Sequence, residues 1–189
     1  MLHACYLVEP VMRLITGEEV RILDVGIGHG EWGHRIKTTK NAGAHITGID
    51  IYRKYLDIQA GLGVYDELLE LNIRDRLPFP RGRFDLGICC EVLEHVDKKA
   101  GPFILTELKR VCNRVILTTP LKHYKAEEEV DGNKNNVHLS EWEPWEISKH
   151  GYHVKVIRRL SRPIYYLERL IRLYRGHNFL YNAHILAWC

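Results

Sequence analysis

Short apolar runs alternate along the chain with segments whose apolar residues recur at helical spacing. The apolar runs predict strands at residues 20–25, 45–51, 67–71, 84–90, 114–118, 152–158 and 183–188. Helical spacing predicts helices at residues 4–16, 31–40, 52–61, 102–110, 140–149 and 163–175. Strands and helices in alternation are typical of a mostly parallel sheet with helices on both faces, so the pattern predicts a three-layer α/β fold. The connection that precedes the last strand predicts that it runs antiparallel.

Two polar segments interrupt this pattern late in the chain. Residues 121–136 are rich in acidic residues and are expected to form a loop over the carboxyl edge of the sheet. The helix that follows is expected to begin at Ser140, because Glu143 stands three residues later and completes a capping box.

A chain of 189 residues is expected to form one domain, spanning residues 1–189. Its content of 46% hydrophobic and 27% charged residues is ordinary for a globular protein. No apolar run approaches the ~20 residues that span a bilayer, and residues 1–13 lack the apolar core of a secretory signal. The five cysteines are odd in number and lack C-x-x-C spacing. They predict reduced thiols and a cytoplasmic location, with neither a zinc site nor a disulfide framework.

Positive charge is concentrated at the carboxyl end of the chain. The net charge is +3, yet residues 149–189 hold eight Lys and Arg residues and a single acidic residue. A helical insertion expected at residues 161–176 places Arg162, Arg169 and Arg172 on one side. Arginine interleaved with tyrosine suits an anionic partner such as RNA or an anionic membrane surface. A solvated face or a dimer contact would need no such partner, and the oligomeric state stays open.

A glycine-rich turn follows the first predicted strand. Asp24 stands near the end of the apolar run, and Gly26, Gly28 and Gly30 follow at alternate positions before a helix begins. Glycine is required where the chain must turn tightly and let a ligand approach the main chain. Asp50 ends the second strand, where a carboxylate can accept hydrogen bonds from both hydroxyls of a ribose. The turn therefore predicts a ligand that carries a nucleoside.

Two ligand classes use such a turn: the nicotinamide or flavin dinucleotides, and S-adenosylmethionine. Residues 28–33 satisfy the dinucleotide pattern G-x-G-x-x-G. Asp24, however, stands where dinucleotide sites have an apolar residue, and its carboxylate can receive the ammonium group of a bound amino acid. The chain also leaves little room for the separate substrate domain of most dehydrogenases. The residues favour S-adenosylmethionine and leave an NAD-linked oxidoreductase as the alternative.

Further segments, in this order along the chain, resemble the class I methyltransferases that depend on S-adenosylmethionine. They are residues 22–30, 48–50, 77–79, 84–86, 91–96, 118–120, 138–140 and 151–154. The resemblance covers about residues 20–156 and implies a Rossmann-like fold, with a seven-stranded sheet whose last strand is antiparallel. It also implies an enzyme that uses S-adenosylmethionine as methyl donor. Residues 111–114 depart from it, because they lack the Pro-Gly-Gly turn of many relatives.

The resemblance also implies which residues hold the methyl donor. The glycine turn would bind the methionine end and Asp50 would bind the ribose. Asn72 and Ile73 would bind the adenine, although many relatives have Asp where Asn72 stands. The backbone carbonyl of Cys90 would accept a hydrogen bond from the ammonium group. The full set of expected donor-binding residues is Asp24, Gly26, Gly28, Gly30, Asp50, Ile51, Asn72, Ile73 and Cys90.

A carboxylate-rich string follows the fourth predicted strand. Glu91, Glu94 and His95 are spaced to share one face of any helix that they occupy. Small-RNA 2′-O-methyltransferases and ubiquinone-pathway O-methyltransferases carry similar strings, and in the former a distant histidine follows. With His138, the three residues would bind Mg²⁺ or Mn²⁺, which would lower the pKa of an accepting hydroxyl. Two other readings stay open: the string orients the loop, or His95 acts as a general base.

The sequence therefore predicts methyl transfer from S-adenosylmethionine to an oxygen or nitrogen acceptor, on a small molecule or on RNA. A second alternative beside the oxidoreductase is a methyltransferase-like subunit that keeps the fold, binds a partner and catalyses nothing.

Overall fold

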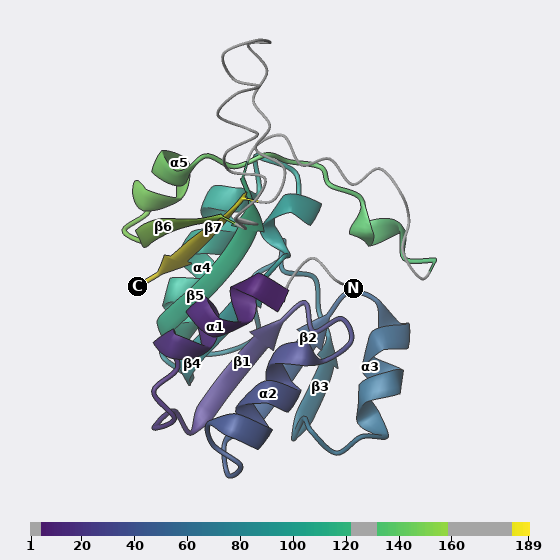
Figure 1. Ribbon diagram of the computed structural model, residues 1–189. Helices are drawn as coiled ribbons and strands as arrows, with labels where there is room; N and C mark the ends of the chain where they lie inside the picture. Colours follow the sequence, from purple (N-terminus) through teal and green to yellow (C-terminus); the bar gives the residue numbers. More distant parts are fainter. Residues whose placement is uncertain (1–4, 122–131, 159–182) are drawn as a thin grey trace, which may run out of the picture.

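The computed structural model of the chain describes residues 5–121, 132–158 and 183–189. Its seven strands form one sheet in the order β3-β2-β1-β4-β5-β7-β6 (Figure 1). The strands are β1 (Arg21–Val25), β2 (His45–Asp50), β3 (Glu67–Glu70), β4 (Phe84–Cys90), β5 (Cys112–Pro120), β6 (His153–Arg158) and β7 (Ala183–Trp188). The first five strands pair in parallel, whereas β7 runs antiparallel to both β5 and β6. The predicted seven-stranded, mostly parallel sheet with an antiparallel last strand is confirmed.

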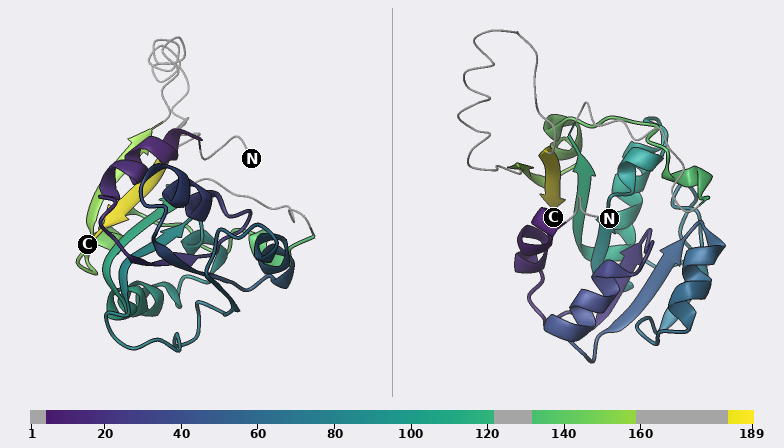
Figure 2. Two further views of the ribbon diagram at one scale, coloured as in Figure 1. Left: turned by 90° about the horizontal axis from the view of Figure 1, so that it is seen from below. Right: turned by 45° about the vertical axis from the view of Figure 1, so that its right-hand side comes forward.

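Helices cover both faces of this sheet. They are α1 (Cys5–Leu14), α2 (Glu31–Thr39), α3 (Arg53–Ala60), α4 (Gly101–Val111) and α5 (Pro144–Ser148), with short 3₁₀ turns η1 (Leu93–His95) and η2 (Lys134–Asn136). One buried apolar cluster packs α1, α2 and α3 against the sheet, and a second packs α4 and α5 against its other face. Figure 2 shows α1 and α2 on the opposite side of the sheet from α4. These layers confirm the predicted three-layer α/β architecture.

Side-chain alternation along β1 builds both clusters at once. Ile22 belongs to the cluster under the first three helices, and its neighbour Leu23 belongs to the cluster under α4. Successive side chains of a strand point to opposite faces, so a strand buried on both sides must be apolar almost throughout. The position of Asp24 inside this strand therefore needs a specific partner.

Strand order reverses between β1 and β4. The chain moves outward from β1 to β2 and β3, and then returns to place β4 on the other side of β1. Because these strands are parallel, their carboxyl ends meet at one edge of the sheet, and ligands of open α/β sheets bind beyond that edge at such a reversal.

The structure corrects the helix expected at residues 140–149. The helix is the shorter α5, and its capping box is formed by Glu143 and Glu146 instead of Ser140 and Glu143. Ser140 is otherwise engaged: its hydroxyl donates to the carbonyl oxygen of Leu93 at 3.1 Å and accepts from the indole N–H of Trp142 at 2.9 Å. Local capping signals cannot reveal such a long-range contact.

Several sequence expectations concern residues outside the described ranges. The first concerns the basic insertion at residues 161–176, which contains Arg162, Arg169 and Arg172. The second concerns most of the loop expected at residues 121–136. Within the described ranges, no helix is both long enough and apolar enough to cross a membrane. Cys89, Cys90, Cys112 and Cys189 carry free thiols.

Candidate functional site

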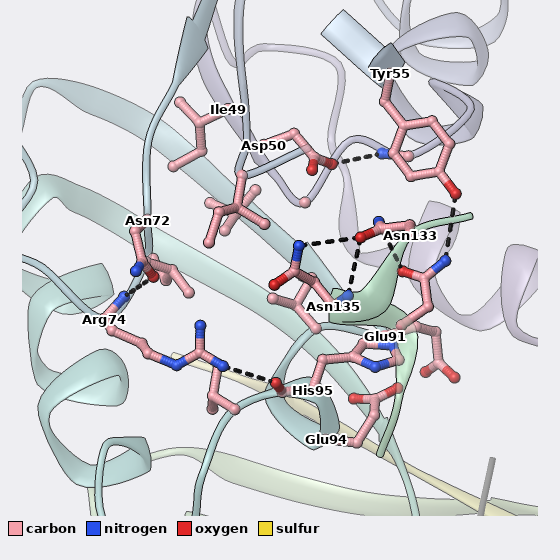
Figure 3. A pocket seen from close by; sticks show the side chains of 18 of the residues that line it. Ile49, Asp50, Tyr55, Asn72, Arg74, Glu91, Glu94, His95, Asn133 and Asn135 are labelled. Carbon is pink, nitrogen blue, oxygen red and sulfur yellow. Dashed lines mark hydrogen bonds between the residues drawn. The ribbon is translucent and has the colours of Figure 1, made fainter. Parts of the chain in front are cut away.

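A cavity of about 460 Å³ lies beyond the carboxyl ends of β1, β2 and β4, where the strand order reverses (Figure 3). Its lining has two parts. We call the part formed by Gly26, Gly28, Asp50, Asn72 and Ile73 the glycine half. The opposite part, formed by Glu91, Glu94, His95, His138 and His184, is the histidine half. Most of the residues singled out from the sequence therefore meet in one cavity.

The glycine turn exposes main chain to the cavity. Gly28 has a φ of +48°, which L side chains rarely adopt, and a Cβ added there would meet nothing within 4 Å. The turn is tied to the neighbouring strand, because the amide of Gly26 donates to the carbonyl oxygen of Ile49 at 2.8 Å. Gly30 also has a positive φ, of +77°, but it does not line the cavity. Open space at Gly28 is where a ligand can approach the backbone.

Asp50 connects this turn to the start of α3. One carboxylate oxygen accepts from the amide of Gly28 at 3.1 Å, and the other accepts from the amide of Tyr52 at 2.8 Å. Burial raises the pKa of the Asp50 carboxyl, and the amides that donate to it lower the pKa in part. Each carboxylate oxygen has a further lone pair that can accept a hydrogen bond, for example from a ribose hydroxyl.

Asn72 and Ile73 form the wall beyond β3. The side-chain oxygen of Asn72 accepts from the amide of Arg74 at 3.0 Å, and Ile73 is buried. The guanidinium of Arg74 then donates to the carbonyl oxygen of His95 at 3.0 Å, which links the two halves. Ile51 also lines the cavity and is 36% exposed.

Asp24 and Cys90 do not line the cavity. The Asp24 carboxylate is buried behind the glycine turn, where one oxygen accepts from the hydroxyl of Tyr65 at 2.7 Å. Its other oxygen has no hydrogen-bond partner among the described residues. Burial raises the pKa of Asp24 to about 6, and burial also raises the pKa of the Cys90 thiol. Their assigned contacts with an ammonium group stay predictions.

The third glycine of the dinucleotide pattern has a packing role. A Cβ at Gly33 would clash with the ring of Tyr65, the residue that donates to Asp24. The glycine therefore lets α2 approach that tyrosine closely. The third glycine of a dinucleotide site has the same packing role, so Gly33 fits either ligand class.

The segment after residue 132 closes the cavity from the side of α3. Asn133, Asn135 and Asn136 line it, and the side-chain amide of Asn136 donates to the hydroxyl of Tyr55 at 3.3 Å. The side-chain oxygen of Asn133 accepts from the amide of Asn135 at 2.9 Å (Figure 3). Sequence reasoning missed these asparagines and Tyr55, because no motif marks them.

Backbone and side-chain hydrogen bonds dock the next few residues on η1. The amide of Leu139 donates to the carbonyl oxygen of Glu94 at 2.8 Å, and the indole of Trp142 donates to that of Leu93 at 3.3 Å. His95 Nδ1 donates to the carbonyl oxygen of Val137 at 3.2 Å, because a carbonyl can only accept. These contacts bring His138 beside His95 and the carboxylates that follow β4.

Glu94, His95 and His138 form a compact group. Each offers one ligand atom, and these atoms lie within 4.8 Å of one another. One oxygen of Glu94 accepts from the hydroxyl of Thr119 at 3.0 Å, while the other is buried and has no partner in the described parts of the chain. Burial raises the pKa of Glu94 well above its ordinary value, with a further contribution from Glu91.

The electrostatics of this group suit a cation. Burial and the neighbouring His138 lower the pKa of His95, so its ring is neutral and Nε2 carries a lone pair. A histidine that donates Nδ1–H to a carbonyl is typical of metal ligands, since that bond fixes the ring. The partnerless oxygen of Glu94 is the other observation that fits a divalent ion.

Glu91 does not belong to this group. It has a φ of +57°, so it precedes η1 in a left-handed conformation, and only Leu93–His95 are helical. The sequence spacing placed Glu91, Glu94 and His95 on one helical face, and that shared face does not form. One oxygen of Glu91 accepts from Thr118 at 2.7 Å, and the other lies 2.9 Å from Nε2 of His184. His184, on β7, was not expected from the sequence.

Comparison with known proteins gives consistent matches. A family profile described as "Methyltransferase domain" matches residues 22–114. A protein named ubiquinone biosynthesis O-methyltransferase from Ralstonia nicotianae is 37% identical over 88 residues, which are 43% of this chain and 34% of that protein. One of the same name from Aromatoleum aromaticum is 30% identical over 112 residues, 56% and 46% of the two chains. The chain thus matches less than half the length of these relatives.

A solved structure, that of a SAM-dependent methyltransferase from Archaeoglobus fulgidus, superimposes with a TM-score of 0.65. The match covers 97% of this chain and 93% of that one at 16% sequence identity, which is a likeness of fold.

Proposed function

We propose that this chain transfers a methyl group from S-adenosylmethionine to a hydroxyl oxygen, because a methyltransferase-domain profile matches residues 22–114 and the fold resembles that of a SAM-dependent methyltransferase. The observation that carries the proposal is the cavity in which Gly28 and Asp50 face a cluster of carboxylates and histidines. The glycine half suits the donor and the histidine half suits an acceptor. An amine nitrogen is the second candidate for the accepting atom.

The glycine half has the groups that the donor needs. Gly28 leaves room for the amino-acid end, Asp50 has lone pairs for the ribose hydroxyls, and Asn72 with Ile73 would hold the adenine. Asp24 lies behind the lining, so it would reach the ammonium group through a water molecule.

S-adenosylmethionine supplies a methyl group on a positively charged sulfur, already activated for displacement. The chain's own residues therefore have to bind both molecules, orient the acceptor and exclude water. His95 is neutral, and its Nε2 can accept the proton that the hydroxyl loses. This general-base role is one of two that we propose to distinguish by experiment.

The other role of His95 is to hold a divalent cation together with Glu94 and His138. An oxygen and two nitrogens suit Mn²⁺ and, with added water ligands, Mg²⁺. Such an ion, when bound, lowers the pKa of a hydroxyl that it contacts. We favour this role, because a bound cation would give the second oxygen of Glu94 a partner. A general-base role of His95 would leave that oxygen without one.

The names of the two relatives, which contain "ubiquinone biosynthesis O-methyltransferase", support an oxygen acceptor, and we propose a small molecule with a ring hydroxyl. RNA with a terminal ribose is the second candidate, since it too presents adjacent hydroxyls. The buried free thiols of Cys89, Cys90 and Cys112 support a cytoplasmic location, and we propose it.

Transfer of tritiated methyl from S-adenosylmethionine to catechol, and in parallel to an RNA oligonucleotide, tests this function. We expect labelled catechol, with loss of turnover in EDTA and recovery with Mg²⁺ or Mn²⁺. Unchanged turnover in EDTA would rule out the cation role and leave the general-base role of His95. Calorimetric binding of NAD without binding of S-adenosylhomocysteine would favour the oxidoreductase. Binding of S-adenosylhomocysteine with no transfer to any acceptor would favour a non-catalytic subunit.

A further inference from the structure

A hydrogen-bonded chain leads from α1 through β7 to the cavity. The hydroxyl of Tyr6 hydrogen-bonds Nδ1 of His184, and Nε2 of His184 lies 2.9 Å from one carboxylate oxygen of Glu91. The hydroxyl of Thr118 donates to the other oxygen at 2.7 Å. The four residues come from α1, β7, β5 and the turn after β4, far apart in the sequence.

The end of the chain at Glu91 has one consistent direction. A carboxylate accepts hydrogen bonds, so the Nε2–H of His184 donates to Glu91. The Tyr6 hydroxyl pairs with Nδ1 on the far side of the ring. Glu91 is therefore held by a donor on each oxygen, and His184 and Thr118 are themselves buried.

The backbone at Glu91 is strained to fit this arrangement. Glu91 is the only non-glycine residue with a positive φ in the described ranges. Its amide also donates to the carbonyl oxygen of Thr118 at 2.9 Å, which holds the turn against β5. A strained backbone conformation persists only where the surrounding structure enforces it, and such conformations are common at functional sites.

Glu91 and His184 both line the histidine half, and neither belongs to the group of Glu94, His95 and His138. We propose that Tyr6, His184 and Thr118 position the Glu91 carboxylate to accept a hydrogen bond from the acceptor hydroxyl. The bond holds the hydroxyl with its reacting lone pair toward the glycine half. Glu91 is then the residue that contacts substrate, and the other three are positioning residues. The inference rests on the proposed methyl transfer.

Substitutions at His184 test the chain. His184→Leu removes the donor, whereas His184→Gln places an amide N–H near the position of Nε2. Tyr6→Phe removes the far end of the chain. The control is His153→Leu, because His153 lies on the adjacent strand β6, is exposed and does not line the cavity. Each variant is assayed for S-adenosylhomocysteine affinity and for kcat and KM with catechol.

We expect His184→Leu to lower kcat by about 100-fold, since misplacing a contact group by about 1 Å has such effects. Affinity for S-adenosylhomocysteine should stay within about twofold, because His184 is not in the glycine half. His184→Gln should recover about a tenth or more of the wild-type kcat, and Tyr6→Phe should lose about threefold. A His184→Leu enzyme with kcat within twofold of wild type would overturn the proposal, as would a His184→Gln enzyme no better than His184→Leu.

Carbon-13 NMR of the Glu91 carboxyl provides a readout that needs no turnover. We expect its resonance to move in His184→Leu and, less, in Tyr6→Phe, and to stay in place in His153→Leu. An unmoved resonance in His184→Leu would contradict the positioning role. If the wild-type chain transfers methyl to no acceptor, the proposed function fails, and the resonance still decides whether His184 orients Glu91.

Discussion

Nδ1 of His95 donates a hydrogen bond to the carbonyl oxygen of Val137, 3.2 Å away and 42 residues later in the chain. This one contact fixes the His95 ring and places His138, the next residue, beside it, with ring centroids 4.9 Å apart. The group of Glu94, His95 and His138 therefore depends on a long-range contact between two loops.

The first prediction concerns the cation. His138→Ala should weaken Mn²⁺ binding by at least about 10-fold, because it removes one of three ligand atoms and loss of an outer-shell partner alone costs about 10- to 100-fold. Calorimetry or the electron paramagnetic resonance of free Mn²⁺ measures this. His45→Ala, at an exposed residue where β2 begins, is the control and should bind Mn²⁺ as wild type does. Equal binding by wild type and His138→Ala would rule out this group as the site.

A second prediction concerns the backbone at Gly28. Gly28→Ala and Gly63→Ala place a methyl group at positive φ with nothing within 4 Å, so each should lower the free energy of unfolding by about 1 kcal/mol. Only Gly28 lines the cavity, so only Gly28→Ala should lose binding of S-adenosylhomocysteine. Urea unfolding and calorimetry measure the two effects. Tight binding by Gly28→Ala would mean that the ligand does not approach the turn.

A third prediction concerns pH and Asp24. Its pKa is about 6 in the folded chain, and a carboxyl in an unfolded chain has a pKa of about 3.9. A raised pKa means that the ionised form is disfavoured on folding, so the contribution of Asp24 to wild-type stability falls as pH rises from about 4 to about 7. Asp24→Asn lacks this loss. Its stability relative to wild type should rise by about 3 kcal/mol between pH 4 and pH 8, measured by urea unfolding. A difference independent of pH would show that Asp24 is not buried in this way.

Proton release tests the predicted role of the same residue in binding. If Asp24 receives the ammonium group, binding of S-adenosylhomocysteine at pH 6 should release about half a proton from wild type, since Asp24 is about half protonated there, and none from Asp24→Asn. Calorimetry in buffers of different ionisation enthalpy detects this, and equal release from both would contradict the role.

A fourth prediction concerns strain at Glu91. Glu91→Ala and Glu91→Gly both remove the carboxylate, but only alanine keeps a Cβ at a φ of +57°. Glu91→Gly should therefore be more stable than Glu91→Ala by about 1 kcal/mol, the reverse of the usual order. Both should lack methyl transfer. Thermal or urea unfolding of the pair checks this, and a less stable glycine variant would contradict it.

The sequence was sufficient for the fold and for the glycine half. Short apolar runs located all seven strands, and β7 matches its predicted range at both ends. Gly28, Asp50, Asn72 and Ile73 meet in the cavity because they follow the carboxyl ends of neighbouring parallel strands. Local rules suffice when a site is made from successive strand ends.

The histidine half was only partly predictable. Helical spacing put Glu91 with Glu94 and His95, but the left-handed backbone at Glu91 turns its carboxylate toward Thr118 and His184. His184 arrives because β7 pairs antiparallel with β5, opposite Pro120. A residue brought in by strand register has no motif, so no local signal marks it.

Methyl transfer in this cavity can be followed directly. The most direct measurement follows a carbon-13 methyl group from S-adenosylmethionine by NMR, with catechol as acceptor and Mg²⁺ or Mn²⁺ present. Wild type should give a new methoxy resonance on the catechol oxygen, and Asp50→Asn, which removes a carboxylate of the glycine half, should give none. If wild-type protein binds S-adenosylhomocysteine but only the labelled sulfonium resonance is seen, methyl transfer in this cavity is contradicted.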